Sequence, residues 1–125
     1  MKNSFLLSGF ILGLVAVLLG AFAAHGLENI LSEDKITSFQ VGVRYQMYHA
    51  LLLIALASFK ELQSKLILMM IIVGVILFSG SIYLLSINEY LEWSYLKVFG
   101  PITPIGGLIL IGVWSLLIFR LIKKS

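Results

Sequence analysis

Four long apolar runs, separated by short polar or charged connectors, dominate the chain. They extend from about Ser4 to Ala24, Val41 to Phe59, Leu66 to Leu85 and Pro101 to Phe119. A helix needs roughly 20 mostly apolar residues to cross the hydrocarbon core of a bilayer, and each run reaches about that length. The pattern predicts an all-α, integral membrane four-helix bundle, in which residues 1–125 form a single four-span domain.

The first apolar run imitates a secretory signal peptide. Lys2 precedes it, and Ala21-Phe22-Ala23 near its end resembles a cleavage site. The apolar part of a signal peptide is normally about 7–15 residues long, and this run is longer. We therefore interpret the run as a membrane span.

The connector before the second run contains a helix start. Ser32 is placed to cap a helix, and Glu33 and Asp34 fall in its first turn, where the helix dipole favours negative charge. No proline interrupts the chain from Glu33 to Phe59. We expect a helix that lies partly in the outer interface and then turns inward, with Gly42 as the point where it could bend.

Composition supports a membrane protein over other classes. The chain is 60% hydrophobic and 12% charged, with a mean hydropathy of +1.05, whereas soluble domains are about 45–50% apolar and ~25% charged. So much apolar surface cannot be buried inside a chain this small, which excludes a soluble domain, a disordered chain and a nucleic-acid-binding module. The absence of cysteine excludes disulfides and thiol chemistry.

The charges predict the orientation. With four spans, one side carries six basic residues against a single acid, and the other carries three basic residues against five acids. Basic residues in short loops favour the cytoplasmic side. We predict cytoplasmic N- and C-termini and a multi-pass protein of the inner or plasma membrane. The basic residues of the first side are Lys2, Lys60, Lys65, Arg120, Lys123 and Lys124.

The polar and small residues within the runs gather toward the predicted outer leaflet. The inner halves of the runs are mostly Leu, Ile, Val and Met. If the protein has a site, we expect it in the outer half, as a cluster that either binds a ligand or packs solid. The candidate residues are His25, Arg44, Tyr45, Gln46, His49, Ser81, Tyr83 and Thr103.

His49 is the candidate that packing explains least easily. It lies roughly 6–12 Å inside the second span, at 1.5 Å of rise per residue, and polar side chains at such depth normally face the bundle interior. Tyr45 and Gln46 precede it by four and three residues and share its helix face. Two interpretations stay open: a ligand or proton role, and a simple hydrogen bond to a neighbouring helix.

The other unusual residues have simpler explanations. His25 suits a wet interface, and Arg44 is close enough to the boundary to reach headgroups; alternatively, both bind an anion beside the start of the fourth helix. Gly9 and Gly13 begin a stripe of small residues that lets helices approach closely, within one chain or between chains. Aromatic residues in the last connector, namely Tyr90, Trp93 and Tyr95, are typical of an interfacial anchor.

The sequence predicts neither an enzyme nor a cofactor. All six acids fall outside the spans, and no catalytic triad, phosphate-binding loop or metal-ligand cluster is present. Two histidines alone do not complete a zinc site. A bis-histidine haem would need His25 and His49 at equal depth, which their positions disfavour. We predict no catalytic, cofactor-binding or metal-binding residues.

Four segments resemble the small bacterial membrane-protein family typified by YgdD and YwdK, domain of unknown function 423. The resemblance covers essentially the whole chain, in the right order, and implies a four-span inner or plasma membrane protein. It implies no activity. The matching segments are Gly20-Ala-Phe-Ala-Ala-His25-Gly26-Leu27, Tyr45-Gln46-x-x-His49-Ala50-Leu51, Phe78-x-Gly80-Ser81-x-Tyr83 and Gly100-Pro101-x-Thr103-Pro104-x-Gly106-Gly107.

These observations favour two non-enzymatic roles. One is an accessory or assembly subunit of a membrane complex, and the other is a protein that binds a lipid, a quinone or another small ligand. The alternative is an oligomeric transporter or channel for ions or small solutes that uses His49. The expected partners are membrane lipids and either further copies of the chain or a larger membrane complex, with no nucleic acid.

Overall fold

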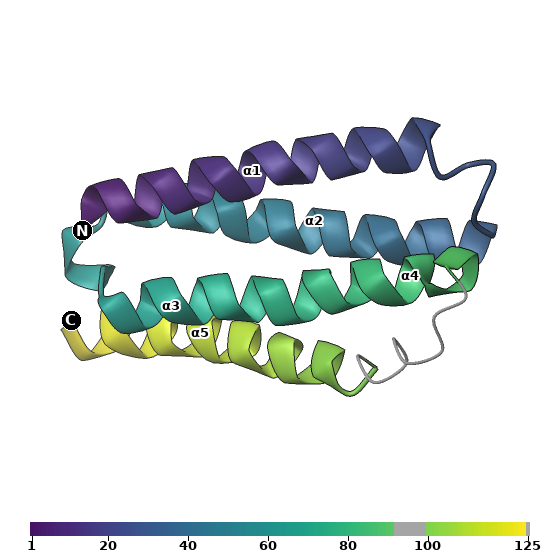
Figure 1. Cartoon of the computed structure of the whole chain (residues 1–125). Coiled ribbons are helices and arrows are strands. Elements are labelled where there is room, and N and C mark those ends of the chain that lie inside the picture. Colours follow the sequence, from purple (N-terminus) through teal and green to yellow (C-terminus); the bar gives the residue numbers. More distant parts are fainter. Residues whose placement is uncertain (92–99, 125) are drawn as a thin grey trace.

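The computed structural model describes residues 1–91 and 100–124, and the predicted aromatic anchor at Trp93 and Tyr95 lies outside them. The described residues form helices and turns, with no strand. Figure 1 shows the long helices side by side, with both chain ends at the same end of the molecule. The elements are α1 (Lys2–His25), α2 (Glu33–Leu56), η1 (Lys60–Leu62), α3 (Lys65–Val75), η2 (Ile76–Gly80), α4 (Ser81–Leu91) and α5 (Ile102–Lys124).

The all-helical architecture with four long helical rods is confirmed. Within the described residues, three stretches are long and apolar enough to cross a membrane: Lys2–His25, Lys65–Asn88 and Ile102–Lys124. The fourth rod, α2, is as long as α1 but more polar. It packs against both α1 and the α3–α4 rod. Four crossings and cytoplasmic termini stay predictions, and the shared position of the termini is compatible with both (Figure 1).

The helix predicted in the first connector is present. The Lys35 backbone N–H donates to Ser32 Oγ over 3.4 Å, which caps α2 at Glu33. The helix continues without interruption through Gly42 to Leu56. It ends at Leu56, before the predicted limit of the apolar run at Phe59, and the Gln63 side chain donates to the carbonyl oxygens of Leu56 and Ala57 at this end.

A π-helical turn divides the third apolar run. η2 joins α3 and α4 into one rod that reaches Leu91, beyond the predicted end at Leu85. Gly106 of α5 lies against this turn, where a Cβ atom would overlap the backbone nitrogen of Phe78. The missing side chain therefore lets two backbones approach closely, as small residues do between membrane helices.

Two apolar clusters fill the interior at opposite ends of the bundle. At the end that carries both termini, here called the basic end, side chains from all four rods pack together. At the opposite end, Ala23, Leu27, Leu31 and Phe39 form a smaller cluster. The cluster at the basic end contains Phe5, Leu53, Leu56, Ala57, Ile67, Ile71, Val75, Leu110, Val113 and Leu117.

The small-residue stripe on α1 joins helices within the chain. A Cβ atom on Gly9 would lie 2.7 Å from Ile54 Cγ1 and 2.9 Å from the carbonyl oxygen of Ala50. Both residues belong to α2. At Gly9, the stripe is thus a close contact between α1 and α2.

Candidate functional site

Two buried polar side chains on α2 are the centre of the candidate site. Gln46 is 4% exposed and His49 is 3% exposed. They are three residues apart and so share one face of the helix. Polar groups buried in an apolar bundle need hydrogen-bond partners, and both have them.

Gln46 connects three helices. Its Nε2 donates to the carbonyl oxygen of Leu12 in α1 over 2.8 Å. Its Oε1 accepts from the Tyr83 hydroxyl in α4 over 2.7 Å. The Tyr83 ring in turn packs against Phe39, with ring centroids 4.8 Å apart. One amide group therefore fixes α2 relative to α1 and α4.

Both ring nitrogens of His49 form hydrogen bonds, and the bond of Nε2 connects α2 to α5. Its Nε2 lies 3.1 Å from Trp114 Nε1, and its Nδ1 lies 2.7 Å from the carbonyl oxygen of Tyr45. An indole N–H only donates, so Nε2 accepts. Nδ1 then carries the proton and donates to Tyr45. These contacts assign a neutral imidazole with one defined tautomer.

A serine in the π-helical turn completes the polar contacts of α2. Ser79 is 1% exposed, and its hydroxyl donates to the carbonyl oxygen of Gly42 over 2.7 Å. A Cβ atom on Gly42 would lie 2.7 Å from Tyr83 Cε1. The rod formed by α3, η2 and α4 is thus held against α2 by a hydrogen bond and a close contact at one glycine.

A groove opens beside His49, between α2 and α5. Its volume is about 310 Å³. Tyr45 and Trp114 are 42% and 46% exposed, so the groove opens at the surface of the bundle. Tyr45 also packs against Phe78, with ring centroids 5.1 Å apart. The lining residues are Tyr45, His49, Phe78, Gly107, Leu110, Ile111 and Trp114.

Comparison with known proteins identifies the family. The model of the family described as "Protein of unknown function (DUF423)" matches residues 19–107. The chain belongs to this family. It is 36% identical to the UPF0382 membrane protein YwdK of Bacillus subtilis, with 95% of this chain and 96% of the relative covered. It is 37% identical to a UPF0382 membrane protein of Haemophilus influenzae, with 100% and 98% covered. No solved structure matches.

Family membership establishes a membrane protein, and the resemblance predicted from the four segments is confirmed. The printed names of these relatives state no activity. The matched segment contains Gln46 and His49 but ends before Trp114. The arrangement of the site must therefore be interpreted from its geometry.

The structure brings some predicted site residues together and separates others. On one face of α2, Gln46 bonds to Tyr83, while His49 bonds to the carbonyl oxygen of Tyr45, in two separate sets of hydrogen bonds. Ser81 and Thr103 instead form their own hydroxyl pair between α4 and the first turn of α5. His25 and Arg44 are both exposed, and neither is among the residues that line the groove. The candidates predicted as one cluster are thus divided between two hydrogen-bonded sets on α2, a separate hydroxyl pair and two exposed residues.

One partner each of Gln46 and His49 lies near the middle of its own helix. Gln46 bonds to Leu12, near the middle of α1, and His49 bonds to Trp114, near the middle of α5. At 1.5 Å of rise per residue, Trp114 lies about 18 Å from one end of α5 and about 15 Å from the other. The groove therefore opens near mid-height of α5.

Sequence reasoning missed two partners. Trp114 was hidden inside an apolar run, although a tryptophan so far from either end departs from the usual interfacial position. Ser79 lies in the segment that begins at Phe78, but the sequence pattern there favours Ser81 as the candidate site residue. Within the described residues, no three His, Cys, Asp or Glu side chains lie close enough together to hold a metal ion.

Proposed function

We propose that this protein is a non-enzymatic plasma-membrane protein that binds a lipid-soluble molecule of the quinone class in the groove beside His49. The observation that carries the proposal is a buried, fully hydrogen-bonded imidazole in an aromatic groove that opens between two long helices. Ligand sites typically combine an apolar lining with a few placed polar groups, and this groove has that composition.

The position of the groove restricts its occupant. In a membrane-spanning bundle, a groove at mid-height opens onto acyl chains, where charged lipid headgroups are costly. An occupant must therefore dissolve in the bilayer core and still present a polar group. A quinone ring meets both conditions, because it is flat, uncharged and carries carbonyl oxygens.

The groove lining offers contacts suited to the ring and the carbonyl oxygens of a quinone. Tyr45, Phe78 and Trp114 supply aromatic surfaces, and aromatic rings favour offset or edge-to-face packing with other rings. Gly107 leaves room beside Phe78, since a Cβ atom there would make only ordinary contact at 3.5 Å. The Tyr45 hydroxyl is a suitable donor to a quinone carbonyl, while the His49–Trp114 bond keeps the indole in place.

The same geometry disfavours proton transport through His49. A relay histidine must release one proton and accept another during each cycle. Both ring nitrogens of His49 already bond to protein groups. Every transfer would therefore break a buried hydrogen bond, and we favour binding over transport.

Fluorescence tests the proposal. The chain has two tryptophans, so Trp93→Phe leaves Trp114 as the sole indole. We expect titration with a short-chain quinone in nanodiscs to quench this emission in a saturable manner. Adding Gly107→Leu fills the groove and should abolish saturation. Gly13→Leu is the matched control, because it enlarges a residue in a different apolar groove, between α1 and α2.

The controls decide between specific and general quenching. Quenching that rises linearly with quinone, or that is the same in the Gly107→Leu and Gly13→Leu backgrounds, would reflect quinone dissolved in the bilayer and would contradict the proposal. In that case, recovery of a stable protein partner after gentle extraction would favour an accessory subunit.

A further inference from the structure

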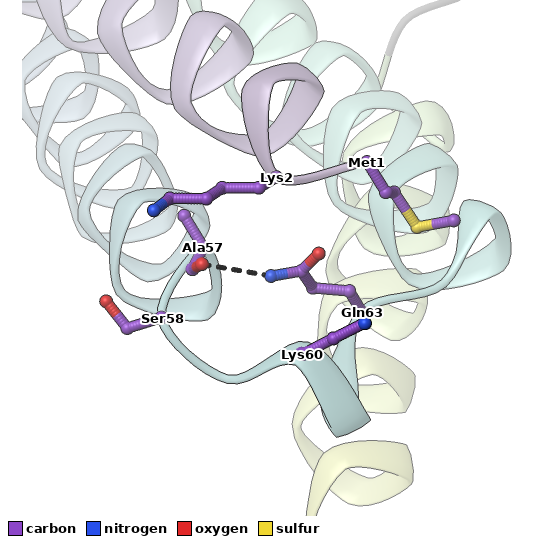
Figure 2. Close-up of a pocket in the computed structure, with 6 residues that line it drawn as sticks. All are labelled: Met1, Lys2, Ala57, Ser58, Lys60 and Gln63. Carbon is purple, nitrogen blue, oxygen red and sulfur yellow. Dashed lines mark hydrogen bonds between the residues drawn. The ribbon is translucent and has the colours of Figure 1, made fainter.

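A second cavity lies at the basic end, far along the helices from His49. It has a volume of about 560 Å³ and is formed by the start of α1, the end of α2 and the turn that follows. Figure 2 shows the Lys2 side chain extending toward the Ala57–Ser58 side of the cavity, with Gln63 opposite. The lining residues are Met1, Lys2, Ala57, Ser58, Lys60 and Gln63.

The lining is cationic. Lys2 and Lys60 contribute two positive charges, Ser58 contributes a hydroxyl group, and none of the six lining residues is acidic. Ser58 and both lysines are exposed. An anion in this cavity would therefore meet opposite charge without an acid beside it.

Gln63 removes a source of repulsion. The last carbonyl groups of a helix carry partial negative charge and lack partners within the helix. Gln63 Nε2 donates to the carbonyl oxygens of Leu56 and Ala57, each over 3.0 Å, and the bond to Ala57 is drawn in Figure 2. This contact satisfies the end of α2 and leaves the lysines to set the sign of the local potential.

The cavity also lies where a lipid phosphate would lie. α1 begins at Lys2 and α2 ends at Leu56, so the cavity marks the ends of two long helices. Met1 and Ala57 add apolar surface to the cationic lining. Basic pockets between helices at the membrane surface are suited to anionic headgroups. We propose that this cavity binds the phosphate headgroup of an anionic phospholipid, with its acyl chains along the adjacent helices.

A neighbouring basic surface provides a contrast at the same end. It is lined by Glu61, Arg120, Lys123 and Lys124. Here an acid is present, and Arg120 Nη1 already donates to Ser64 Oγ over 2.8 Å. One N–H donor of Arg120 is therefore already occupied within the protein. This surface has similar basic content without the features that favour a headgroup in the first cavity.

The contrast supplies a matched experiment. We would compare Lys2→Gln/Lys60→Gln with Lys123→Gln/Lys124→Gln, because each pair removes two positive charges from the same end. The proteins would be placed in nanodiscs of phosphatidylcholine with a minor fraction of phosphatidylglycerol, and lipids retained after release would be counted by native mass spectrometry. We expect affinity for phosphatidylglycerol to fall about 10- to 30-fold in the first variant only.

A third variant and a phosphate-binding measurement complete the test. Ser58→Asp places an acid in the cavity without removing a lysine, so it should also weaken retention of phosphatidylglycerol. It replaces the Lys2→Gln/Lys60→Gln variant in the test if that variant does not fold. Equal loss in both charge-matched variants would overturn the proposal, because it would indicate general attraction to the membrane surface. Binding of inorganic phosphate to detergent-solubilised protein with the same dependence on Lys2 and Lys60, and without lipid retention, would also overturn it.

Discussion

The two halves of the bundle are held together in different ways. At the basic end, the described interior contacts are apolar, as with Phe5, Leu53 and Val113. From mid-height toward the opposite end, α2 is bonded through side chains to each of its neighbours. Lipid chains are as apolar as leucine, so apolar packing in a membrane gains little from exclusion of water. Shape must position the helices in the first half, while hydrogen bonds add directionality in the second.

α2 is the least apolar of the long helices, and its buried polar residues contribute to this difference. A polar residue on a membrane helix is costly when unpaired, but Gln46 and His49 are both paired. Their partners belong to α1, α4 and α5. Gln46 and His49 thus add to the polarity that charged residues such as Glu33, Asp34 and Arg44 give α2, and they also define its position among the rods.

The largest expected effect is a difference in labelling between cysteines placed at the two ends of the bundle, which shows the side of the membrane that each end faces. The natural chain has no cysteine, so Ser32→Cys and Ser125→Cys each introduce a unique label. If α2 crosses the bilayer, an impermeant maleimide applied to intact cells should modify the first and spare the second. Labelling of both from the same side would contradict the four-span topology.

The next largest effect is expected from overpacking in the half of the bundle opposite the basic end. Gly106→Ala places a methyl group against the backbone of Leu77 and Phe78 in the π-helical turn. We expect it to destabilise the protein by about 3 kcal/mol, because overpacking against rigid groups costs ~1–3 kcal/mol and sometimes more. Gly107→Ala is the control, where only ordinary contact results and the better helix propensity of alanine opposes any loss.

Unfolding in mixed micelles would measure both free energies. Similar stability of the two variants would show that α5 moves away from η2 without cost. The contact at Gly106 would then be incidental to the fold.

Much of the architecture could be predicted because it depends on local pattern. Four apolar runs specify four long helices, and Ser32 with Glu33 specifies the start of α2. The close contact between Gly106 and the π-helical turn could not be predicted, since it joins segments far apart in the sequence.

The site was predicted only in part for the same reason. Gln46 and His49 were conspicuous as polar residues in an apolar run. Their partners depend on which helices become neighbours and at what height, which no local pattern states. Trp114 is 65 residues from His49, and the carbonyl of Leu12 has no sequence signature at all. Residue type therefore identified Gln46, His49 and Tyr83, but neither Trp114 nor the carbonyl group of Leu12.

The smallest expected effect is the contribution of a single hydrogen bond, the one between His49 and Trp114. His49→Leu removes the acceptor for Trp114, and Trp114→Phe removes the donor while keeping an aromatic ring. We expect a coupling free energy of about 0.6 kcal/mol in a double-mutant cycle, with an upper value of ~1.7 kcal/mol, as for other hydrogen bonds between membrane helices. His25→Leu, at the exposed end of α1, is the control and should leave stability nearly unchanged.

The size of the coupling free energy shows whether the His49–Trp114 bond contributes to stability. A coupling near zero would mean that the His49–Trp114 bond adds nothing beyond packing, so that α5 is held against α2 by shape alone. A coupling of the expected size, together with little effect of His25→Leu, would assign His49 a positional role. The bond would then hold α5 against α2 and set the width of the groove that lies between them.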